Sequence, residues 1–371
     1  MDKKIIAIVL VIVLVAAALA AGIVLMSSSG APSAPSNIRV GYIAGDIHHL
    51  PFAIANNVTV GGTESIYAAN DLNVTANGYA NGGAIMDTGF AQDAIDIAYV
   101  GSAPAISKHL NLGKSMLNTS IIAQVNEEGS LIVADLATSN ASDLVGKKVA
   151  SPSKASIQYL ILLKWLENNG LNITGDLKPY NGTVTYIGSV NYTDAAAGTL
   201  KTLMTKPSTD VDHIAAFICW EPFGSDVIDG GIGHLLASSH DVWPNHPCCV
   251  IVVSNVFAAT HPEAVKRFIA AHKQAINWTN TAKNTNATAN YMLLVEITSS
   301  FTAKNATVAA DALAEMKYSY DISASTIDML EEFTQKMMDF NLIAASKLTA
   351  GGNTYASVSD FIANYVKTDY I

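Results

Sequence analysis

One glycine–serine turn in this chain has residue types that are typical of a ligand-binding site. A short apolar run, Ile97–Val100, predicts a buried strand, and Gly101 and Ser102 follow it directly. Ser102 suits a helix N-terminus, and Pro104 suits the first helical turn, where no backbone N–H is needed. A chain that enters a helix in this way directs free N–H groups, including that of Ala103, toward a polar or anionic ligand. The alternative is an ordinary strand-to-helix turn without a ligand.

Four other predicted strands carry polar or small residues at or just beyond their carboxyl ends. The strands cover 38–43, 121–125, a segment ending at Ala150, and 214–219. In open α/β sheets, ligands bind beyond the carboxyl ends of strands, so these residues are further candidates for ligand binding. They are Gly45, Asp46, His48 and His49; Gln124 and Asn126; Ser153, Ala155 and Ser156; and Trp220 and Glu221.

Each candidate has a chemical role and a structural alternative. The histidine pair can donate to an anion, although one of the two is equally suited to a helix start or the surface. The Gln–Asn pair can bond a ligand or form a hinge turn, and the serines can donate to a ligand or cap a helix. Trp220 can wall an apolar part of a ligand or pack in the core, and Glu221 can accept from an amine.

The sequence contains no metal-binding or catalytic motif with the usual residue spacing. The potential ligands His48, His49, His246 and Cys248 or Cys249 are spread over about 200 residues and form no Cys-x-x-Cys or His-x-x-x-His pair. Three cysteines, an odd number, do not make a disulfide framework. Nucleophile-elbow, P-loop and dinucleotide-binding motifs are also missing from usable contexts. We therefore predict no metal site, no cofactor and no enzymatic activity.

Composition and charge limit the partners of the protein. The 371 residues carry a formal net charge of -10, with 21 basic and 31 acidic side chains and without a basic cluster. This balance argues against nucleic acid as a partner. Hydrophobic residues make up 50% of the chain, enough for an Ala-rich globule of two lobes.

The N-terminus predicts export. Lys3 and Lys4 precede an uncharged apolar run over 5–26, longer than a secretory h-region of about 7–15 residues and close to the ~20 residues of a membrane span. We expect residues 1–26 to be a membrane anchor or, if cleaved near 18–20, a signal peptide, and residues 27–36 to be a Ser/Pro-rich tether. Both alternatives place the body outside the cytoplasm.

Ten Asn-x-Ser/Thr sequences support an export route with N-glycosylation. Such dense external glycosylation fits an archaeal cell surface. The ten acceptors are Asn57, Asn73, Asn118, Asn140, Asn172, Asn181, Asn191, Asn277, Asn286 and Asn305.

Predicted strands alternate with predicted helices up to residue 280, and 290–371 is mostly helical, most clearly over 321–341. Helices are also expected over 84–94, from 157 and over 262–280, and 56–83 is expected to hold surface loops and a short strand. The fold class is therefore α/β with parallel sheets, and two sheets suit this length better than one.

Several stretches, in this order, resemble one family. That family is the solute-binding proteins of ABC importers in the aliphatic sulfonate, taurine and nitrate class, which includes binders of thiamine-pyrimidine precursors. Trp220-Glu221-Pro222-Phe223 is the most specific match. The others are Val40-Gly41-Tyr42 with Gly45-Asp46, DIAYVGSAPA over 96–105, LVGKKVA with SPSKAS over 144–156, and PCCV with the segments 255–257 and 261–268.

The resemblance implies a two-lobed periplasmic-binding-protein (type II) fold with a hinge and a ligand cleft. It places lobe one at 37–126 and 251–371 and lobe two at 127–250, with crossings near 125–131 and 247–254. The candidate loops would then converge on the cleft.

Two departures from the family leave the solute open. Ala155 stands where the family often has glycine, and 56–83 differs from the usual segment. A distant branch of the fold makes thiamine pyrimidine with a histidine and clustered cysteines, but here there is only a cysteine pair.

We expect an extracytoplasmic solute-binding protein that delivers a small, anionic organic solute, sulfonate-like or nitrate-like, to an ABC permease in the membrane. The alternative is a non-transport cell-surface protein, such as an adhesin, sensor or coat component. An importer subunit should keep an open cleft, whereas a structural derivative should fill it.

Overall fold

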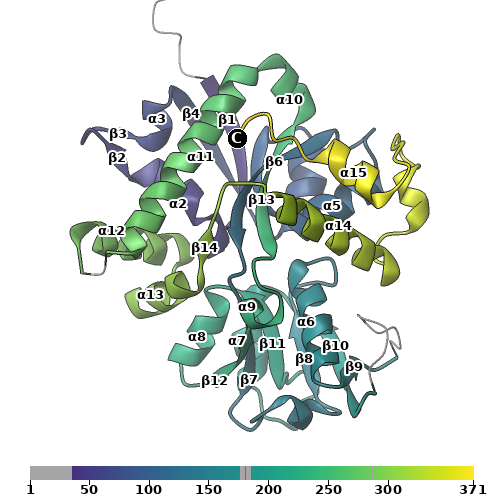
Figure 1. Ribbon diagram of the computed structural model, residues 1–371. Coiled ribbons are helices and arrows are strands. Elements are labelled where there is room, and N and C mark those ends of the chain that lie inside the picture. Colours follow the sequence, from purple (N-terminus) through teal and green to yellow (C-terminus); the bar gives the residue numbers. More distant parts are fainter. Residues whose placement is uncertain (1–35, 176–179, 181–184, 286) are drawn as a thin grey trace, which may run out of the picture. The chain divides into compact units, whose positions relative to one another are not determined.

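Two six-stranded sheets organise the chain in the computed structural model, which describes residues 36–371 apart from 176–179, 181–184 and 286 (Figure 1). Residues 37–371 form one unit. The first sheet has the order β14 (Lys317–Tyr318), β6 (Thr119–Glu127), β13 (Pro247–Ser254), β5 (Ile97–Gly101), β1 (Ser36–Ile43) and β4 (Leu72–Tyr79). The second has the order β12 (Gly233–Ser238), β7 (Ser130–Asp135), β11 (Ala216–Trp220), β8 (Lys148–Ser151), β10 (Gly188–Asp194) and β9 (Leu171–Ile173).

Both sheets are mixed, which corrects the expectation of parallel sheets. Strands β1 and β5 are parallel, as are β8, β9, β10 and β11, but β13 runs antiparallel to both β5 and β6. Strand β7 likewise runs antiparallel to β11 and β12. The changes of sheet account for this: β6 leaves the first sheet at the end where β13 enters it, so these two strands run in opposite directions.

The chain changes sheets at two places. It leaves the first sheet between Glu127 and Ser130, within the segment expected for the first crossing. It returns between Ser238 and Pro247, by way of α9 (Ser239–Val242). Residues 247–250, expected in lobe two, are therefore paired in the first sheet.

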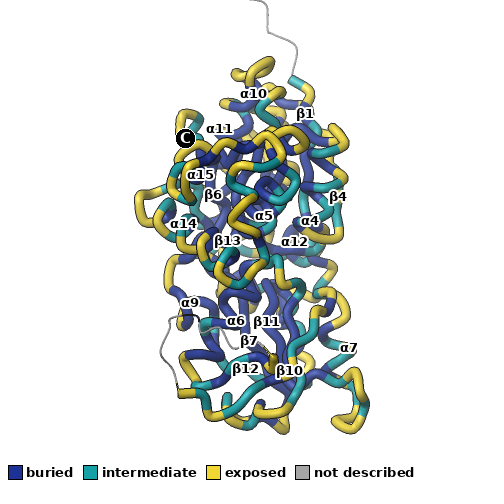
Figure 2. Tube along the Cα trace, turned by 90° about the vertical axis from the view of Figure 1, so that its right-hand side faces the viewer, coloured by how far each residue is buried: buried dark blue, intermediate teal, exposed yellow. Residues whose placement is uncertain are grey.

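Helices cover the sheets as the apolar patterns predict. Strands β6, β11 and β13 are buried almost along their whole length, while exposed residues gather on the outer helices (Figure 2). Helices α2 (Leu50–Asn57), α3 (Ile66–Ala69), α11 (Pro262–Lys283) and α12 (Ala289–Thr302) pack together, as do α5 (Ser102–Leu112), α14 (Ala324–Asp339) and α15 (Val358–Tyr365). The second sheet packs against α6 (Ile157–Asn168) and α8 (Phe223–Asp229).

Shorter elements complete the fold. They are β2 (Thr59–Val60), β3 (Glu64–Ser65), α4 (Gly82–Ala84), α7 (Leu200–Thr205), α10 (Asn255–Thr260) and α13 (Ala306–Glu315), with the 3-10 turns η1 (Ile47–His49), η3 (Ala141–Leu144), η4 (Ala197–Thr199) and η5 (Ala345–Leu348). The helix expected over 84–94 is mainly a π-helix, η2 (Ile85–Phe90). The strand β4 lies inside the region expected to be largely loops.

The predicted membrane segment 1–26 and the tether residues 27–35 lie outside the described residues. Within the described part of the chain, no helix combines the length and the apolar character that a membrane crossing requires.

A buried histidine makes the stability of the first sheet sensitive to acid. His272 on α11 is fully buried, with Nδ1 3.2 Å from the hydroxyl of Tyr99 and Nε2 donating to the carbonyl of Gln124 at 2.9 Å. Burial lowers the pKa of His272 from 6.5 to about 4. Between these two values the unfolded chain takes up a proton that the folded chain does not.

We therefore expect the free energy of unfolding to fall as the pH drops from about 6.5 to about 4, with His272 contributing on the order of 3 kcal/mol of that loss. The variant His272→Gln keeps a side-chain donor but cannot take up this proton. Urea unfolding at pH 7 and pH 4.5 should show a smaller loss in the variant than in the wild type. An equal loss in both proteins would contradict this role of His272.

Candidate functional site

A cavity of about 540 Å³ lies between loops that belong to the two sheets. The first sheet contributes residues after β1, around α4 and η2, at the β5–α5 turn and at the start of β13. The second sheet contributes the β8–α6 segment and the end of β11. Lining residues from both sides thus come from loops at strand ends, as expected for an α/β fold.

Seven of the predicted candidates line this cavity, and seven do not. The lining candidates are Asp46, His48, Gly101, Ser153, Ala155, Ser156 and Trp220. The candidates that are not among the lining residues are Gly45, His49, Ser102, Ala103, Gln124, Asn126 and Glu221.

The glycine–serine turn reaches the cavity through its glycine. Gly101 lines the cavity, whereas Ser102 is fully buried and donates its hydroxyl hydrogen bond to the carbonyl of Pro247 at 3.1 Å. Ala103 is also fully buried. The serine therefore joins α5 to β13.

The side chains of Gln124 and Asn126 are bonded within the fold. Gln124 accepts from the hydroxyl of Thr326 at 3.2 Å. Asn126 accepts from the backbone N–H of Cys249 at 3.2 Å and donates to the carbonyl of Glu128 at 3.2 Å. Asn126 thus connects the two segments where the chain changes sheets.

Glu221 supports the loop after β11. Its carboxylate accepts from the backbone N–H of Ser225 at 3.0 Å and from the hydroxyl of the same residue at 2.5 Å. Burial raises the pKa of Glu221 to about 7. Trp220 beside it is largely buried, and its indole Nε1 has no hydrogen-bond partner among the described residues.

The serines of the β8–α6 segment combine capping with a place on the cavity wall. Ser156 caps α6 by accepting from the backbone N–H of Tyr159 at 3.4 Å, and it donates its hydroxyl to the carbonyl of Ser153 at 2.6 Å. The hydroxyl of Ser153 accepts from the backbone N–H of Ala155 at 3.1 Å.

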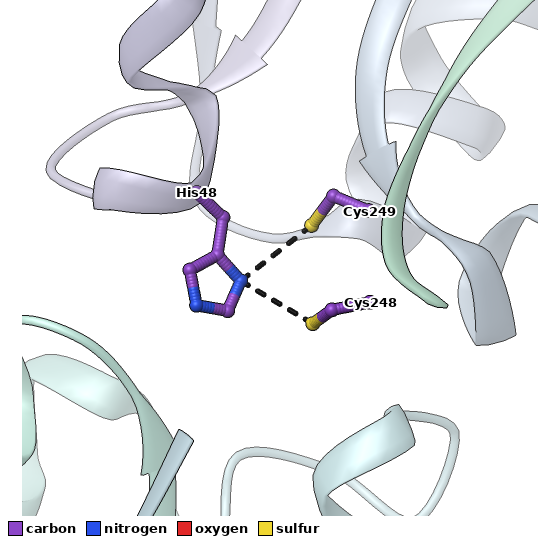
Figure 3. A group of neighbouring side chains, drawn as sticks. All are labelled: His48, Cys248 and Cys249. Atoms are coloured by element: carbon purple, nitrogen blue, oxygen red, sulfur yellow. Dashed lines mark hydrogen bonds between the residues drawn. The ribbon is translucent and has the colours of Figure 1, made fainter. Parts of the chain in front are cut away.

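A histidine and two cysteines form the most unusual part of the cavity wall (Figure 3). His48 Nδ1 lies 3.3 Å from Sγ of Cys248 and 3.7 Å from Sγ of Cys249. His48 Nε2 lies 2.7 Å from the carbonyl oxygen of Gly129 and must donate to it, because a carbonyl only accepts. The other ring nitrogen, Nδ1, therefore faces the two sulfurs.

A β-bulge explains how two adjacent residues can direct their sulfurs to one atom. Neighbouring side chains of a regular strand point to opposite faces. Between β13 and β6, however, Pro247 pairs with Glu127 and Cys249 with Asn126, so that Cys248 is an extra residue. Such a bulge reorients side chains locally.

Burial, neighbouring charges and hydrogen bonds all shift the pKa values of this group. The hydrogen bond from Cys249 lowers the pKa of Cys248 well below its usual value, while burial raises that of Cys249. Burial alone would lower the pKa of His48, but the charges of Cys248 and Asp46 raise it to about 9. Burial raises the pKa of Asp46 to about 7.

These donor atoms correct one sequence-based argument. The wide spacing of the histidines and cysteines predicted no metal-ligand set, but the fold brings donor atoms of His48, Cys248 and Cys249 within 4.8 Å of one another. Asp46, His49 and Cys249 form a second such group. Thiolate sulfur and imidazole nitrogen are donors that suit soft and borderline metal ions.

Among the further lining residues that were not predicted, four carry amide or charged side chains: Asn81, Asp87, Lys108 and Gln158. Lys108 forms an ion pair with Asp87, whose second carboxylate oxygen is buried without a partner among the described residues. Gln158 donates to the hydroxyl of Ser130 at 3.1 Å and lies 3.9 Å from Sγ of Cys248. Asp87 and Gln158 lie inside expected helices, where a polar residue is ordinarily solvated, so their types gave no signal.

The sequence profile of the NMT1-like family matches residues 31–293, and the chain belongs to this family. A search among curated proteins gives no match to the sequence.

Solved structures share the fold. The ligand-binding component of an ABC-type import system from Staphylococcus aureus, with zinc bound, has a TM-score of 0.67 at 16% identity, over 90% of this chain and 97% of that one. The nitrate-binding protein NrtA from Synechocystis PCC 6803 has a TM-score of 0.68 at 15% identity, over 92% and 88%. The alkanesulfonate-binding protein SsuA from Xanthomonas axonopodis pv. citri, bound to MOPS, has a TM-score of 0.63 at 14% identity, over 84% and 96%. The predicted α/β periplasmic-binding-protein fold is thereby confirmed.

The position of His48 depends on a glycine in the first crossing. Gly129 has a φ of +82°, and a Cβ built on it would lie 2.7 Å from both His48 Nε2 and Met316 Sδ. Gly146, with a φ of +75°, has no atom within 4 Å of the same position and is a matched control.

We expect Gly146→Ala to cost about 1 kcal/mol of unfolding free energy through backbone strain alone, and Gly129→Ala to cost at least about 1 kcal/mol more because of the two clashes. Urea unfolding of the two variants measures the difference. Equal losses would show that the environment of Gly129 does not constrain His48.

Proposed function

We propose that this protein is the extracytoplasmic solute-binding subunit of an ABC importer. The observation that carries the proposal is the cavity of about 540 Å³, whose lining comes from loops of both sheets. Its volume falls within the ~300–1,000 Å³ of small-molecule sites. The family and the fold shared with binding proteins of import systems support the same function.

Two buried polar atoms of cavity-lining residues have no hydrogen-bond partner among the described residues. Trp220 Nε1 is a donor without an acceptor, and Asp87 Oδ1 is an acceptor without a donor. A buried donor without a partner costs about 1–3 kcal/mol, and an anionic solute that accepts from Trp220 would recover this free energy, whereas a nitrate or sulfonate group has no hydrogen to donate to Asp87. The indole of Trp220 therefore supports a small solute with an acceptor group.

The solute class we propose is a small organic anion, sulfonate-like or nitrate-like. Donors for it are the indole of Trp220, the ammonium of Lys108, and the hydroxyl of Ser153, which accepts from the backbone N–H of Ala155 and keeps its own hydrogen for the solute. The structurally similar SsuA and NrtA are named for an alkanesulfonate and for nitrate. Binding makes and breaks no bond, so we propose that the protein is not an enzyme.

Capture would proceed by closure of two lobes. The sequence assigns 37–126 and 251–371 to lobe one and 127–250 to lobe two. We move residues 247–250 to lobe one, because β13 belongs to its sheet. The hinge would lie in the two crossing segments. The backbone N–H of Glu128 donates to the carbonyl of His246 at 3.1 Å, and Glu128 Oε1 accepts from the backbone N–H of Asn245 at 2.6 Å. The two segments can therefore bend together.

We further propose that the body is outside the cytoplasm, anchored by residues 1–26 or released by cleavage, and glycosylated. Seven acceptor asparagines are exposed, Asn172 is half-buried, and Asn181 and Asn286 lie outside the described residues. The exposed seven are Asn57, Asn73, Asn118, Asn140, Asn191, Asn277 and Asn305.

The open cavity also bears on the alternative of a non-transport surface protein. A structural derivative of the fold should fill its cleft with bulky side chains, whereas here serines, glycines and two alanines lie among the lining residues. This observation favours the transport subunit.

A thermal-shift screen of the full chain tests the function. The solutes are small sulfonates, nitrate, bicarbonate, amino acids and thiamine precursors, and a binding solute should raise the Tm by mass action. No shift with any class would contradict the proposal.

For the solute that binds, Trp220→Phe should weaken the Kd about tenfold, because the ring remains but its N–H is lost. Trp243→Phe, at a buried tryptophan outside the cavity lining, is the matched control and should leave the Kd unchanged. Isothermal titration calorimetry gives both values. An unchanged Kd in Trp220→Phe would remove the indole from the site.

A further inference from the structure

We propose that the cavity wall holds one thiophilic metal ion, with Zn²⁺ as its probe, through His48 Nδ1 and the sulfurs of Cys248 and Cys249. The fourth coordination position faces the cavity and takes a donor atom of the solute. This last part rests on the proposed function, whereas the three-residue metal site does not.

The distances from the histidine to the two sulfurs fit a metal ion. In a tetrahedral zinc site, with Zn–N of about 2.0–2.1 Å and Zn–S of about 2.3 Å, nitrogen and sulfur ligands lie about 3.6 Å apart. The separations from His48 Nδ1 are 3.3 Å to Cys248 Sγ and 3.7 Å to Cys249 Sγ. Both separations match those of a zinc site, and all three donor atoms lie within 4.8 Å of one another.

The ring of His48 is already oriented as a metal ligand. Its Nε2 donates to the carbonyl of Gly129 at 2.7 Å, which fixes the ring with Nδ1 toward the two sulfurs, and Nδ1 would release its proton when an ion binds. A backbone carbonyl behind a ligating histidine is the usual outer partner of such sites. On the other side, Gln158 Nε2 lies 3.9 Å from Cys248 Sγ and can donate to the thiolate.

The second donor group, Asp46 with His49 and Cys249, is less suitable. His49 Nδ1 accepts from the backbone N–H of Ile43 at 2.8 Å, so its Nε2 carries the hydrogen. Asp46 Oδ1 accepts from the backbone N–H of His48 at 2.9 Å. Asp46 thus contributes negative charge beside the ion, with its carboxylate 4.0 Å from His48 Nδ1.

The cysteine pair remains available as thiols. All three cysteines of the chain are free. Adjacent Cα atoms are only about 3.8 Å apart, below the ~4.4–6.8 Å that disulfides span, so the pair does not readily oxidise to a bridge. Two thiolates with a neutral imidazole would balance a divalent charge, and binding would release the thiol protons.

Because the three ligands line the cavity, one coordination position of the ion would be open toward it. His48, Cys248 and Cys249 all line the cavity, so solvent or solute can reach the ion from that side. Three protein ligands with one open position characterise zinc sites that engage a second molecule. The geometry thus points to a solute, such as an organic anion, held partly through the metal.

The test is a metal titration of the reduced, chelator-treated full chain. Co²⁺ should produce a thiolate-to-metal charge-transfer band that saturates at one ion per chain, and Zn²⁺ should displace it and raise the Tm. Cys248→Ser and Cys249→Ser should each weaken Zn²⁺ binding at least 100-fold. Cys219→Ala, at a buried thiol outside the group, should leave it unchanged.

The double variant Cys248→Ser/Cys249→Ser, with its folding checked by circular dichroism, shows whether Zn²⁺ binds at another place in the chain. If this folded variant still binds Zn²⁺ as the wild type does, or if the wild type gives no charge-transfer band, the metal site is overturned.

Calorimetry with a binding solute separates this proposal from the proposed function. Solute should bind the Zn²⁺-loaded chain at least tenfold more tightly than the metal-free chain. Equal affinities would overturn the role of the ion and leave the solute-binding function intact. A metal site without any solute would support the three ligands and contradict the solute-binding function.

Discussion

The carbonyl oxygen of Gly129 is the point on which the candidate site depends. It accepts hydrogen bonds from His48 Nε2 at 2.7 Å and from the backbone N–H of Glu221 at 3.0 Å. One atom of the first crossing thus fixes a side chain at the first sheet and the loop after β11 of the second. The αL backbone of this turn, with φ of +59° at Glu128 and +82° at Gly129, turns the carbonyl toward both donors. This contact thus helps to hold both the ring of His48 and the loop after Trp220 at the cavity.

The second crossing contributes the other half of the site. Asn126 and Glu128 bond the returning segment, and the bulge at Cys248 directs two adjacent sulfurs toward His48. The same few residues therefore join the sheets, shape the cavity and supply its most reactive groups. Any movement between the two sheets has to bend these crossings, so the proposed lobe closure on a solute would act through them.

The sequence predicts the elements of the fold better than the interior of the site. Apolar runs separated by glycine, proline and capping residues predict strands and helices such as β1, β5 and α11. Residues at or after the ends of strands are also predictable as candidates, and three of them, Asp46, Ser153 and Trp220, do line the cavity. Spacing cannot show that His48 meets Cys248, because 200 residues and a bulge separate them. The antiparallel direction of β13 has no local signal in the sequence, because it depends on where the chain re-enters the first sheet.

We expect a solute to occupy the cavity between the two sheets. The most direct test is the electron density of a crystal structure of the full chain, grown with a solute that shifts the Tm. Density should lie inside the cavity, with a polar atom of the solute within hydrogen-bond distance of Trp220 Nε1. Density for the solute outside the cavity, with the surroundings of Trp220 and His48 unchanged, would contradict this expectation.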